Sequence, residues 1–330
     1  MAVHNGERFL EEAVRSVLTQ SLTDLELLVI DDGSTDATPD MLAALATGDP
    51  RVVVHRHANR GRPASLNRGV QLAAAPVIAR LDADDVCLPG RLERQLAFLE
   101  QHEQVALVGG AVHLIDADGR CFEQSRYPLS DPDIRAAFAY TCPFVHSAVM
   151  FRRSAFEQAG GYRDLNDAED MDLWLRISER HELAGIPEPV VAYRFHAGQV
   201  SVRKCELQAL GVVAARLAAR ERAAGRADPL DGVERIDEEW LREHGAGALE
   251  IATTVVKSQA WLANVIARAG GAEQADALLA AAQARARSQA DDGSLLALVH
   301  RARATRRYEQ GRPVRARLER GRAVLAQRRR

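Results

Sequence analysis

Apolar residues in the first part of the chain alternate between helical and strand-like spacing. At residues 7–20 they recur every three or four positions, which predicts an amphipathic helix. Residues 25–30 form an almost continuous apolar run, as expected for a strand buried on both faces. The same reading predicts helices at 38–45, 64–75 and 89–101 and strands at 52–55, 77–81 and 105–115. This alternation indicates an α/β fold, with a mostly parallel sheet and helices on both faces.

The pattern changes further along the chain. Residues 120–200 are less regular and contain one clear helix, at 170–180. From about residue 204, alanine and arginine dominate, proline and glycine become rare, and the spacing is helical nearly to the end. We therefore expect an α/β domain at residues 1–203 and an all-α C-terminal extension at residues 204–330.

Composition and charge narrow the possible functions. The 330 residues are 47% hydrophobic and 27% charged, which is ordinary for a globular protein. The net charge of −3 argues against general nucleic-acid binding. Positive charge is concentrated at the end, because residues 301–330 carry twelve arginines and two glutamates. We expect this segment to be either a solvated basic helix or a peripheral contact with an anionic membrane surface.

Cysteine usage and hydropathy indicate a cellular location. None of the four cysteines (Cys87, Cys121, Cys142 and Cys205) forms a CxxC pair, so zinc-knuckle and thioredoxin-like motifs are excluded. Scattered thiols are typical of a reducing compartment. No apolar run approaches the ~18 residues of a membrane span, and the first residues lack the apolar region of a signal peptide. We expect a cytoplasmic protein, in contact with the inner face of the membrane if its basic end binds lipid.

Two acidic clusters follow predicted strands. Asp31 and Asp32 end the apolar run at 25–30, and the acidic segment 82–85 (DADD) follows the strand at 77–81. Ligands of an open parallel sheet bind beyond the carboxyl ends of its strands. Five carboxylates there repel one another unless a cation or hydrogen-bond donors compensate them. The clusters therefore predict a Mg²⁺ or Mn²⁺ site for a nucleotide diphosphate, the alternative being polar loops without a ligand.

A basic segment precedes the helix predicted at 64–75. Its sequence is NRGRPASLNRG, and it places Arg60, Arg62 and Arg68 around the start of that helix. The beginning of a helix favours anions. The three arginines are therefore candidates for phosphate binding, and a solvated basic turn is the alternative.

Several segments together carry a specific resemblance. They are NGERFLEEAVRSVLTQSLTDLELLVIDDGSTDAT, NRGRPASLNRG, VIARLDADDVCLPGRLERQLAFL, CPFVHSAVMFRRSAFEQAGGY, NDAEDMDLWLRI and YRFHAGQVS. In their order and spacing, over about residues 1–203, the chain resembles the family 2 glycosyltransferases of the GT-A fold, of the bacterial surface-polysaccharide type. The resemblance implies that residues 1–203 are a catalytic domain that uses a nucleotide-sugar.

The resemblance also implies a donor and metal site. Asp31 recognises the nucleotide base, Asp82 binds the nucleoside end, and Asp84 is the last acid of the DxD motif, which ligates Mn²⁺ or Mg²⁺ at the diphosphate. Such a metal neutralises the charge that develops on the leaving phosphate. The expected donor-binding residues are Asp31, Asp82, Arg62, His196 and Val3, and the expected metal ligands are Asp84 and His196.

The Glu169–Asp170 pair begins the helix at 170–180. In bare sequence, acidic residues in a first helical turn are ordinary. The resemblance implies instead that Asp170 is the general base that deprotonates the acceptor hydroxyl. One base and one displacement, without a covalent intermediate, imply inversion at the anomeric carbon. Three further residues, His146, Arg152 and Arg153, are left open between an acceptor-side and a structural role, and Trp174 is expected in the core.

The chain departs from the family pattern in two places. The Gln-x-x-Arg-Trp motif of the processive enzymes and transmembrane helices are both absent from the sequence, which favours transfer of a single sugar. Only residues 1–4 precede the NGE segment, so most of the first strand is missing. We expect the native polypeptide to begin upstream of Met1, with that strand lying between the strands at 25–30 and 77–81.

These features together predict an inverting, metal-dependent glycosyltransferase. Its donor would be a UDP-sugar, and its acceptor a hydroxyl of a glycan or of a lipid-linked saccharide in cell-surface polysaccharide synthesis. A nucleotidyltransferase is an alternative, although the Gly-rich phosphate loop it needs is not found. A degenerate module that binds sugar-nucleotides or glycans without catalysis is another. No GxGxxG motif supports a dehydrogenase. The helices at 204–330 either pack on the catalytic domain or bind a partner or the acceptor.

Overall fold

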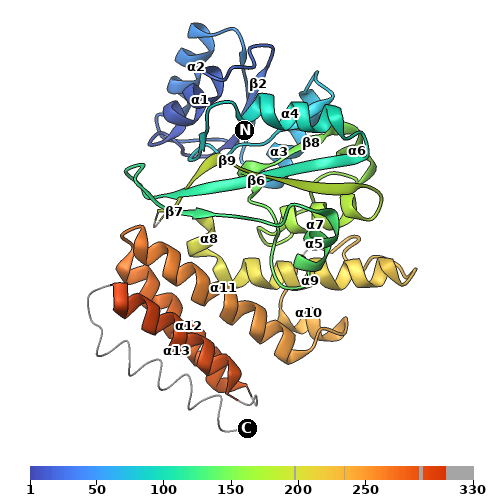
Figure 1. The fold of residues 1–330 in the computed structure, drawn as a ribbon, viewed down its shortest axis with the longest axis vertical. Helices are drawn as coiled ribbons and strands as arrows, with labels where there is room; N and C mark the ends of the chain where they lie inside the picture. The colour runs from blue at the N-terminus through green and yellow to red at the C-terminus, as the bar shows by residue number, and fades with distance from the viewer. Residues whose placement is uncertain (197, 234, 290–292, 310–330) are drawn as a thin grey trace. The chain divides into compact units, whose positions relative to one another are not determined.

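The computed structural model describes all residues except 197, 234, 290–292 and 310–330 (Figure 1). The chain divides into two compact units. The first comprises Met1–Asp164 and Glu169–Arg194, and the second comprises Leu165–Ala168 and the chain from Phe195 onward. Most of the basic segment expected to contact lipid, from residue 310 on, lies outside the described residues.

The first unit begins with a three-stranded parallel sheet, in the order β1-β2-β3. Its strands are β1 (Ala2–Val3), β2 (Leu27–Asp31) and β3 (Val52–Arg56), connected through α1 (Leu10–Leu18) and α2 (Thr38–Gly48), with α3 (Arg62–Leu72) following β3. Helix α1 buries Leu10, Ala13, Val14 and Val17, four of the five apolar positions on the predicted face, and the fifth, Leu18, is half-buried.

Strand β1 occupies one side of this sheet. It pairs in parallel with β2, with Ala2 opposite Ile30 and Val3 opposite Asp31. The strand expected on its other side, β4 (Val77–Ala79), belongs instead to the second sheet, where it pairs with β8. The position expected for the first strand, between the strands at 25–30 and 77–81, is therefore confirmed on the β2 side and wrong on the β4 side. A two-residue strand offers few main-chain groups for a second ladder.

The second sheet of the unit has the order β4-β8-β6-β9-β5, with β7 pairing to β6. Its further strands are β5 (Val86–Cys87), β6 (Val105–Ile115), β7 (Cys121–Ser125), β8 (Met150–Arg152) and β9 (Glu182–Arg194). The long strands β6 and β9 are parallel, and the other ladders are antiparallel. The mixed pairing of this sheet was not evident from hydrophobic spacing, which reports burial rather than strand direction.

Helices pack around the second sheet. They are α4 (Arg91–Gln101), α5 (Asp131–Ala137), the 3₁₀ turn η1 (His146–Ala148), α6 (Arg153–Gln158) and α7 (Glu169–Ser178). Trp174 of α7 is fully buried, with its ring near those of Phe151 and Tyr162. Trp174 is therefore a core residue, as the apolar stripe of its helix predicts.

The second unit is helical. Its helices are α8 (Val200–Arg203), α9 (Cys205–Ala223), α10 (Glu238–Glu243), α11 (Ala248–Arg268), α12 (Ala272–Ser288) and α13 (Ser294–Glu309). Helix α11 packs against α9, α12 and α13 (Figure 1). Helices α11, α12 and α13 share a core that includes Ala252, Val256, Ala282 and Leu295. Among the described helices, none combines the length and apolar character needed to cross a bilayer. The helical character expected of the C-terminal region is confirmed, and the boundary expected near residue 203 stays a prediction.

Candidate active site

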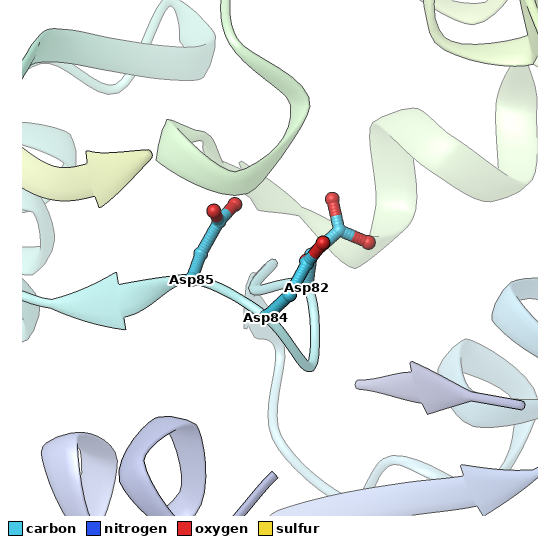
Figure 2. A group of neighbouring side chains, drawn as sticks. All are labelled: Asp82, Asp84 and Asp85. Carbon is cyan, nitrogen blue, oxygen red and sulfur yellow. The ribbon is translucent and has the colours of Figure 1, made fainter. Parts of the chain in front are cut away.

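Three aspartates gather on the loop between β4 and β5. One carboxylate oxygen from each of Asp82, Asp84 and Asp85 lies within 4.8 Å of the others. Figure 2 shows the three side chains pointing to the same side of this loop, which we call the acidic loop (residues 82–85). Ionised carboxylates at this separation repel one another, and a cation between them offsets the repulsion. Carboxylate oxygens are the ligands that Mg²⁺ and Mn²⁺ prefer, so the donor set fits a hard divalent cation.

Asp82 is held by two buried partners. Its carboxylate forms an ion pair with Arg80, and it accepts a hydrogen bond from the Ser147 hydroxyl at 3.0 Å. The same hydroxyl oxygen accepts the main-chain N–H of Asp82 at 3.0 Å. Burial opposes ionisation of Asp82, but the Arg80 guanidinium outweighs it and holds the pKa of Asp82 below its usual value. Asp82 is therefore an ionised carboxylate with a fixed orientation.

Asp85 is the most buried member of the acidic loop. Its Oδ1 accepts the main-chain N–H of Arg194 at 2.8 Å. Burial raises the pKa of Asp85 well above its usual value, and the nearby charges of Asp84 and Asp82 raise it further. A divalent cation bound among the three carboxylates would oppose this shift, because it stabilises their charged forms.

The end of β2 brings two expected donor-binding residues together. Asp31 is 1% exposed. Its Oδ1 accepts the main-chain N–H of Ser34 at 2.9 Å, and its Oδ2 lies 3.1 Å from Arg56 Nε. Val3 is the ladder partner of Asp31, and the Val3 carbonyl accepts the main-chain N–H of Asp32 at 2.8 Å. The sheet thus places Val3 and Asp31 side by side, although they are far apart in sequence.

Asp32 orders the basic segment that follows β3. Its two carboxylate oxygens accept the main-chain N–H groups of Arg60 at 2.8 Å and Gly61 at 3.0 Å. Arg62 then begins α3, and its Nε lies 2.6 Å from Oε1 of the fully buried Glu169. Arg62, expected to face a phosphate, therefore also contacts the residue beside the predicted base. Its role in donor binding stays a prediction.

Asp170 lies half-buried in the first turn of α7. Its Oδ1 accepts the main-chain N–H of Met171 at 2.7 Å. Burial and the neighbouring charge of Glu169 raise the pKa of Asp170 to about 6, against the smaller opposing effects of that hydrogen bond, Arg62 and Arg80. A carboxylate with this pKa is ionised at neutral pH and is a stronger base than an ordinary aspartate.

His146 adjoins the acidic loop. Its Nε2 lies 2.8 Å from the Tyr162 hydroxyl, and its ring packs edge-on against Trp174 at 5.9 Å between centroids. Burial and the Arg80 charge lower the pKa of His146 well below its usual value, so the ring is neutral. The two arginines left open with it make structural contacts. Arg152 donates to the carbonyls of Leu99, His102 and Val105, and Arg153 donates to that of Ala73.

Comparison with known proteins identifies the family. The model of glycosyl transferase family 2 matches residues 1–160. The amylovoran biosynthesis glycosyltransferase AmsE of Erwinia amylovora is 35% identical over 211 residues, which cover 62% of this chain and 78% of that protein.

The chain belongs to glycosyltransferase family 2.

Another similar protein and two solved structures extend this result. The O-antigen biosynthesis glycosyltransferase WbnJ of Escherichia coli is 31% identical over 54% of this chain and 69% of its own length. S. aureus TarS 1-349 in complex with UDP-GlcNAc aligns with a TM-score of 0.52 at 16% identity, over 94% of this chain and 90% of that one. The mannosyltransferase PcManGT from Pyrobaculum calidifontis, in complex with GDP-Man and Mn²⁺, aligns at 0.51 and 18% identity, over 97% and 85%. These similarities confirm the GT-A fold.

Sequence reasoning missed three residues that hold the acidic loop of this family 2 glycosyltransferase. They are Arg80, Ser147 and Arg194. A charged residue inside the apolar run at 77–81 was an available signal for Arg80. His196 belongs to the second unit, so its expected roles in metal and donor binding stay predictions.

Proposed function

We propose that this family 2 glycosyltransferase is an inverting, metal-dependent enzyme that transfers a single sugar from a nucleotide-sugar to a hydroxyl group. The observation that carries the proposal is the clustering of Asp82, Asp84 and Asp85 within 4.8 Å, together with a separate carboxylate, Asp170, whose pKa is raised to about 6. The first set suits a cation at a diphosphate, and the second suits a general base.

The donor half of the site follows from the acidic loop. Asp84 is half-buried, and Asp82 is held by Arg80 and Ser147. We assign Asp84 and His196 to Mn²⁺ or Mg²⁺, and Asp31, Asp82, Arg62, His196 and Val3 to the donor. The cation would supply positive charge to the leaving diphosphate. A UDP-sugar is the proposed donor, and the UDP-GlcNAc bound by TarS supports it.

The acceptor half centres on Asp170. Its carboxylate accepts the proton of the acceptor hydroxyl while that oxygen forms a bond to the anomeric carbon. The bond from the anomeric carbon to the diphosphate breaks on the opposite face, so the configuration inverts. Glu169 makes Asp170 more basic, and the contact of Glu169 with Arg62 holds the pair in place.

The names of relatives guide the choice of acceptor. AmsE is a glycosyltransferase of amylovoran biosynthesis, and WbnJ is one of O-antigen biosynthesis. We therefore propose a glycan or lipid-linked saccharide in cell-surface polysaccharide synthesis as the acceptor. We also propose that the chain works in the cytoplasm, at the inner face of the membrane.

A thermal-shift panel with product analysis tests the proposal. The full chain is heated with UDP-, GDP- and dTDP-sugars, each with and without Mn²⁺. We expect one donor class to raise the melting temperature, and only with Mn²⁺. Turnover of that donor should release a nucleoside diphosphate. Release of pyrophosphate from a nucleoside triphosphate and a sugar phosphate would identify a nucleotidyltransferase, and donor binding without turnover on any acceptor or water would identify a binding module.

A further inference from the structure

Arg194 is the last residue of β9, and two ladders determine where it lies. The antiparallel ladder pairs Val86 of β5 with Ala192, so the end of β9 runs back along the acidic loop that precedes β5. The parallel ladder pairs Ile115 of β6 with Arg194, which places the turn after β6 on the other side. Arg194 thus stands where three separate parts of the first unit meet. Its side chain is 2% exposed.

Arg194 binds the acidic loop through two different groups. Its main-chain N–H donates to Oδ1 of Asp85 at 2.8 Å, and its side-chain Nε donates to the main-chain carbonyl of Asp84 at 2.7 Å. The first hydrogen bond holds the carboxylate of Asp85, and the second holds the backbone of Asp84. Arg194 therefore holds the acidic loop at two of its three aspartates.

The two terminal nitrogens of the Arg194 guanidinium, Nη1 and Nη2, also form hydrogen bonds. Nη1 donates to the carbonyl of Asp116 at 3.2 Å, and Nη2 donates to Oε2 of Glu12 in α1 at 2.6 Å. The guanidinium also lies over the ring of Phe9, 4.6 Å from its centroid. A buried charge is stable only when it is paired and hydrogen-bonded. These contacts meet that condition and leave the side chain one orientation.

We propose that Arg194 is a positioning residue that presents Asp84 and Asp85 to the divalent cation, with Glu12 as its charge partner. The proposal rests on the metal-dependent function proposed above. Three carboxylates that repel one another would spread apart on an unrestrained loop, and the two hydrogen bonds from Arg194 oppose this. Glu12 compensates the positive charge of Arg194, which would otherwise repel a cation bound at the same loop.

The variant Arg194→Lys separates the two anchors. It keeps the positive charge and the main-chain hydrogen bond to Asp85, but it loses the planar guanidinium that reaches Asp84, Asp116 and Glu12 together. Residues that orient metal ligands typically change metal affinity by ~10–100-fold when replaced. We expect a loss of Mn²⁺ affinity in that range, with a matching rise in the Mn²⁺ concentration for half-maximal turnover and a much smaller change in kcat at saturating Mn²⁺.

A matched control removes the contribution of general destabilisation. Like Arg194, Arg152 donates to main-chain carbonyls, here those of Leu99, His102 and Val105, none of which belongs to the acidic loop. Arg152→Lys should lower the melting temperature as Arg194→Lys does, and leave Mn²⁺ affinity unchanged. Affinity is measured on the full chain by titration with Mn²⁺ alone, following the loss of the paramagnetic resonance signal of the free aqua ion.

Glu12→Gln provides a second variant, which we expect to fold because the Glu12 side chain is 54% exposed. It keeps the shape of the side chain and removes its charge. We expect Mn²⁺ binding to weaken by about threefold, a small effect because solvent screens a half-exposed pair. This variant decides the matter if Arg194→Lys does not fold.

The outcomes are distinct. Suppose that Arg194→Lys and Glu12→Gln both fold, melt at lower temperature and bind Mn²⁺ as tightly as the parent. This result would overturn the positioning role and leave the proposed function intact. The same conclusion follows if Arg194→Lys fails to fold and Glu12→Gln binds Mn²⁺ as the parent does. A parent chain that binds no Mn²⁺ would overturn the metal assignment and this inference with it.

Discussion

Arg62 Nε and Glu169 Oε1 lie 2.6 Å apart, which joins the start of α3 to the residue before the predicted base. Glu169 is fully buried, whereas the Arg62 side chain is partly exposed. An isolated buried carboxylate is unfavourable, so the guanidinium is what allows a second negative charge beside Asp170. This pair therefore connects the basic segment expected at the donor to the residue expected to accept the proton.

The contact predicts how the pH dependence of turnover responds to Glu169→Gln. The negative charge of Glu169 contributes to raising the pKa of Asp170 to about 6, after the larger effect of burial. Without that charge the pKa of Asp170 falls, so the base stays ionised to lower pH. The acidic limb of the profile of kcat/KM against pH should move to lower pH. Glu157→Gln, at an exposed position of α6, should leave it in place. An acidic limb that stays in place or moves to higher pH in Glu169→Gln would contradict this prediction.

Asp170→Asn keeps the shape of the side chain and removes the base. Donor binding should survive, and kcat should fall by ~10²–10⁴-fold, as is typical when a general base is lost. Steady-state kinetics and donor titration on the same preparation separate the two effects. Asp164→Asn, at an exposed position nearby in sequence, serves as the control. If turnover stays within a few-fold of the parent, another residue is the base, and Glu169 is the next candidate.

Asp84→Ala should abolish metal-dependent donor binding while the chain stays folded, because the side chain is only half-buried. Calorimetric titration with a nucleoside diphosphate, with and without Mn²⁺, measures this. Removal of the metal with a chelator should reduce the parent to the level of the variant. Asp118→Ala, in an exposed turn, should behave as the parent. Unchanged Mn²⁺-dependent affinity in Asp84→Ala would refute the metal assignment.

Ser147→Ala removes a fully buried hydroxyl that donates to Asp82 and accepts from both its main-chain N–H and Arg80. Arg80 and Asp82 each lose a hydrogen-bond partner in this variant, which should lower the free energy of unfolding by about 1–3 kcal/mol. Urea unfolding of the variant and parent measures the difference. Ser154→Ala, at an exposed position of α6, should change it little. A loss no greater than in that control would show that the hydroxyl does not stabilise Asp82.

From the positive charge of the basic C-terminal segment, we predict that the chain binds anionic vesicles. Deletion of residues 310–330, the larger part of the basic segment 301–330, should lower co-sedimentation with such vesicles and leave turnover on a soluble acceptor unchanged. Binding of the full chain should weaken as salt is added, because exposed charges are screened beyond ~10 Å at 0.1 M ionic strength. Neutral vesicles are the control. Equal co-sedimentation of the full and shortened chains would argue against a membrane contact.

Much of this protein was predictable from sequence because local periodicity reports burial. The apolar run at 105–115 became β6 (Val105–Ile115), and the stripe at 7–20 became α1 (Leu10–Leu18). The order of the motifs in the chain was enough to indicate the family, since each motif is a short stretch that can be read without knowing its neighbours in space. The aspartates of the acidic loop were found for the same reason.

Contacts between residues far apart in the chain depend on the tertiary structure. Arg194 and Glu12 are 182 positions apart, and Ser147 reaches Asp82 across 65. The pairing of β5 and β6 with β9 brings Arg194 to the acidic loop, and hydrophobic spacing contains no record of which strands are neighbours. Local pattern was therefore enough to place many of the helices and strands and to single out the acidic residues of the loop. Strand pairing determined the residues that hold those carboxylates, because long-range contacts depend on the packing of the whole sheet.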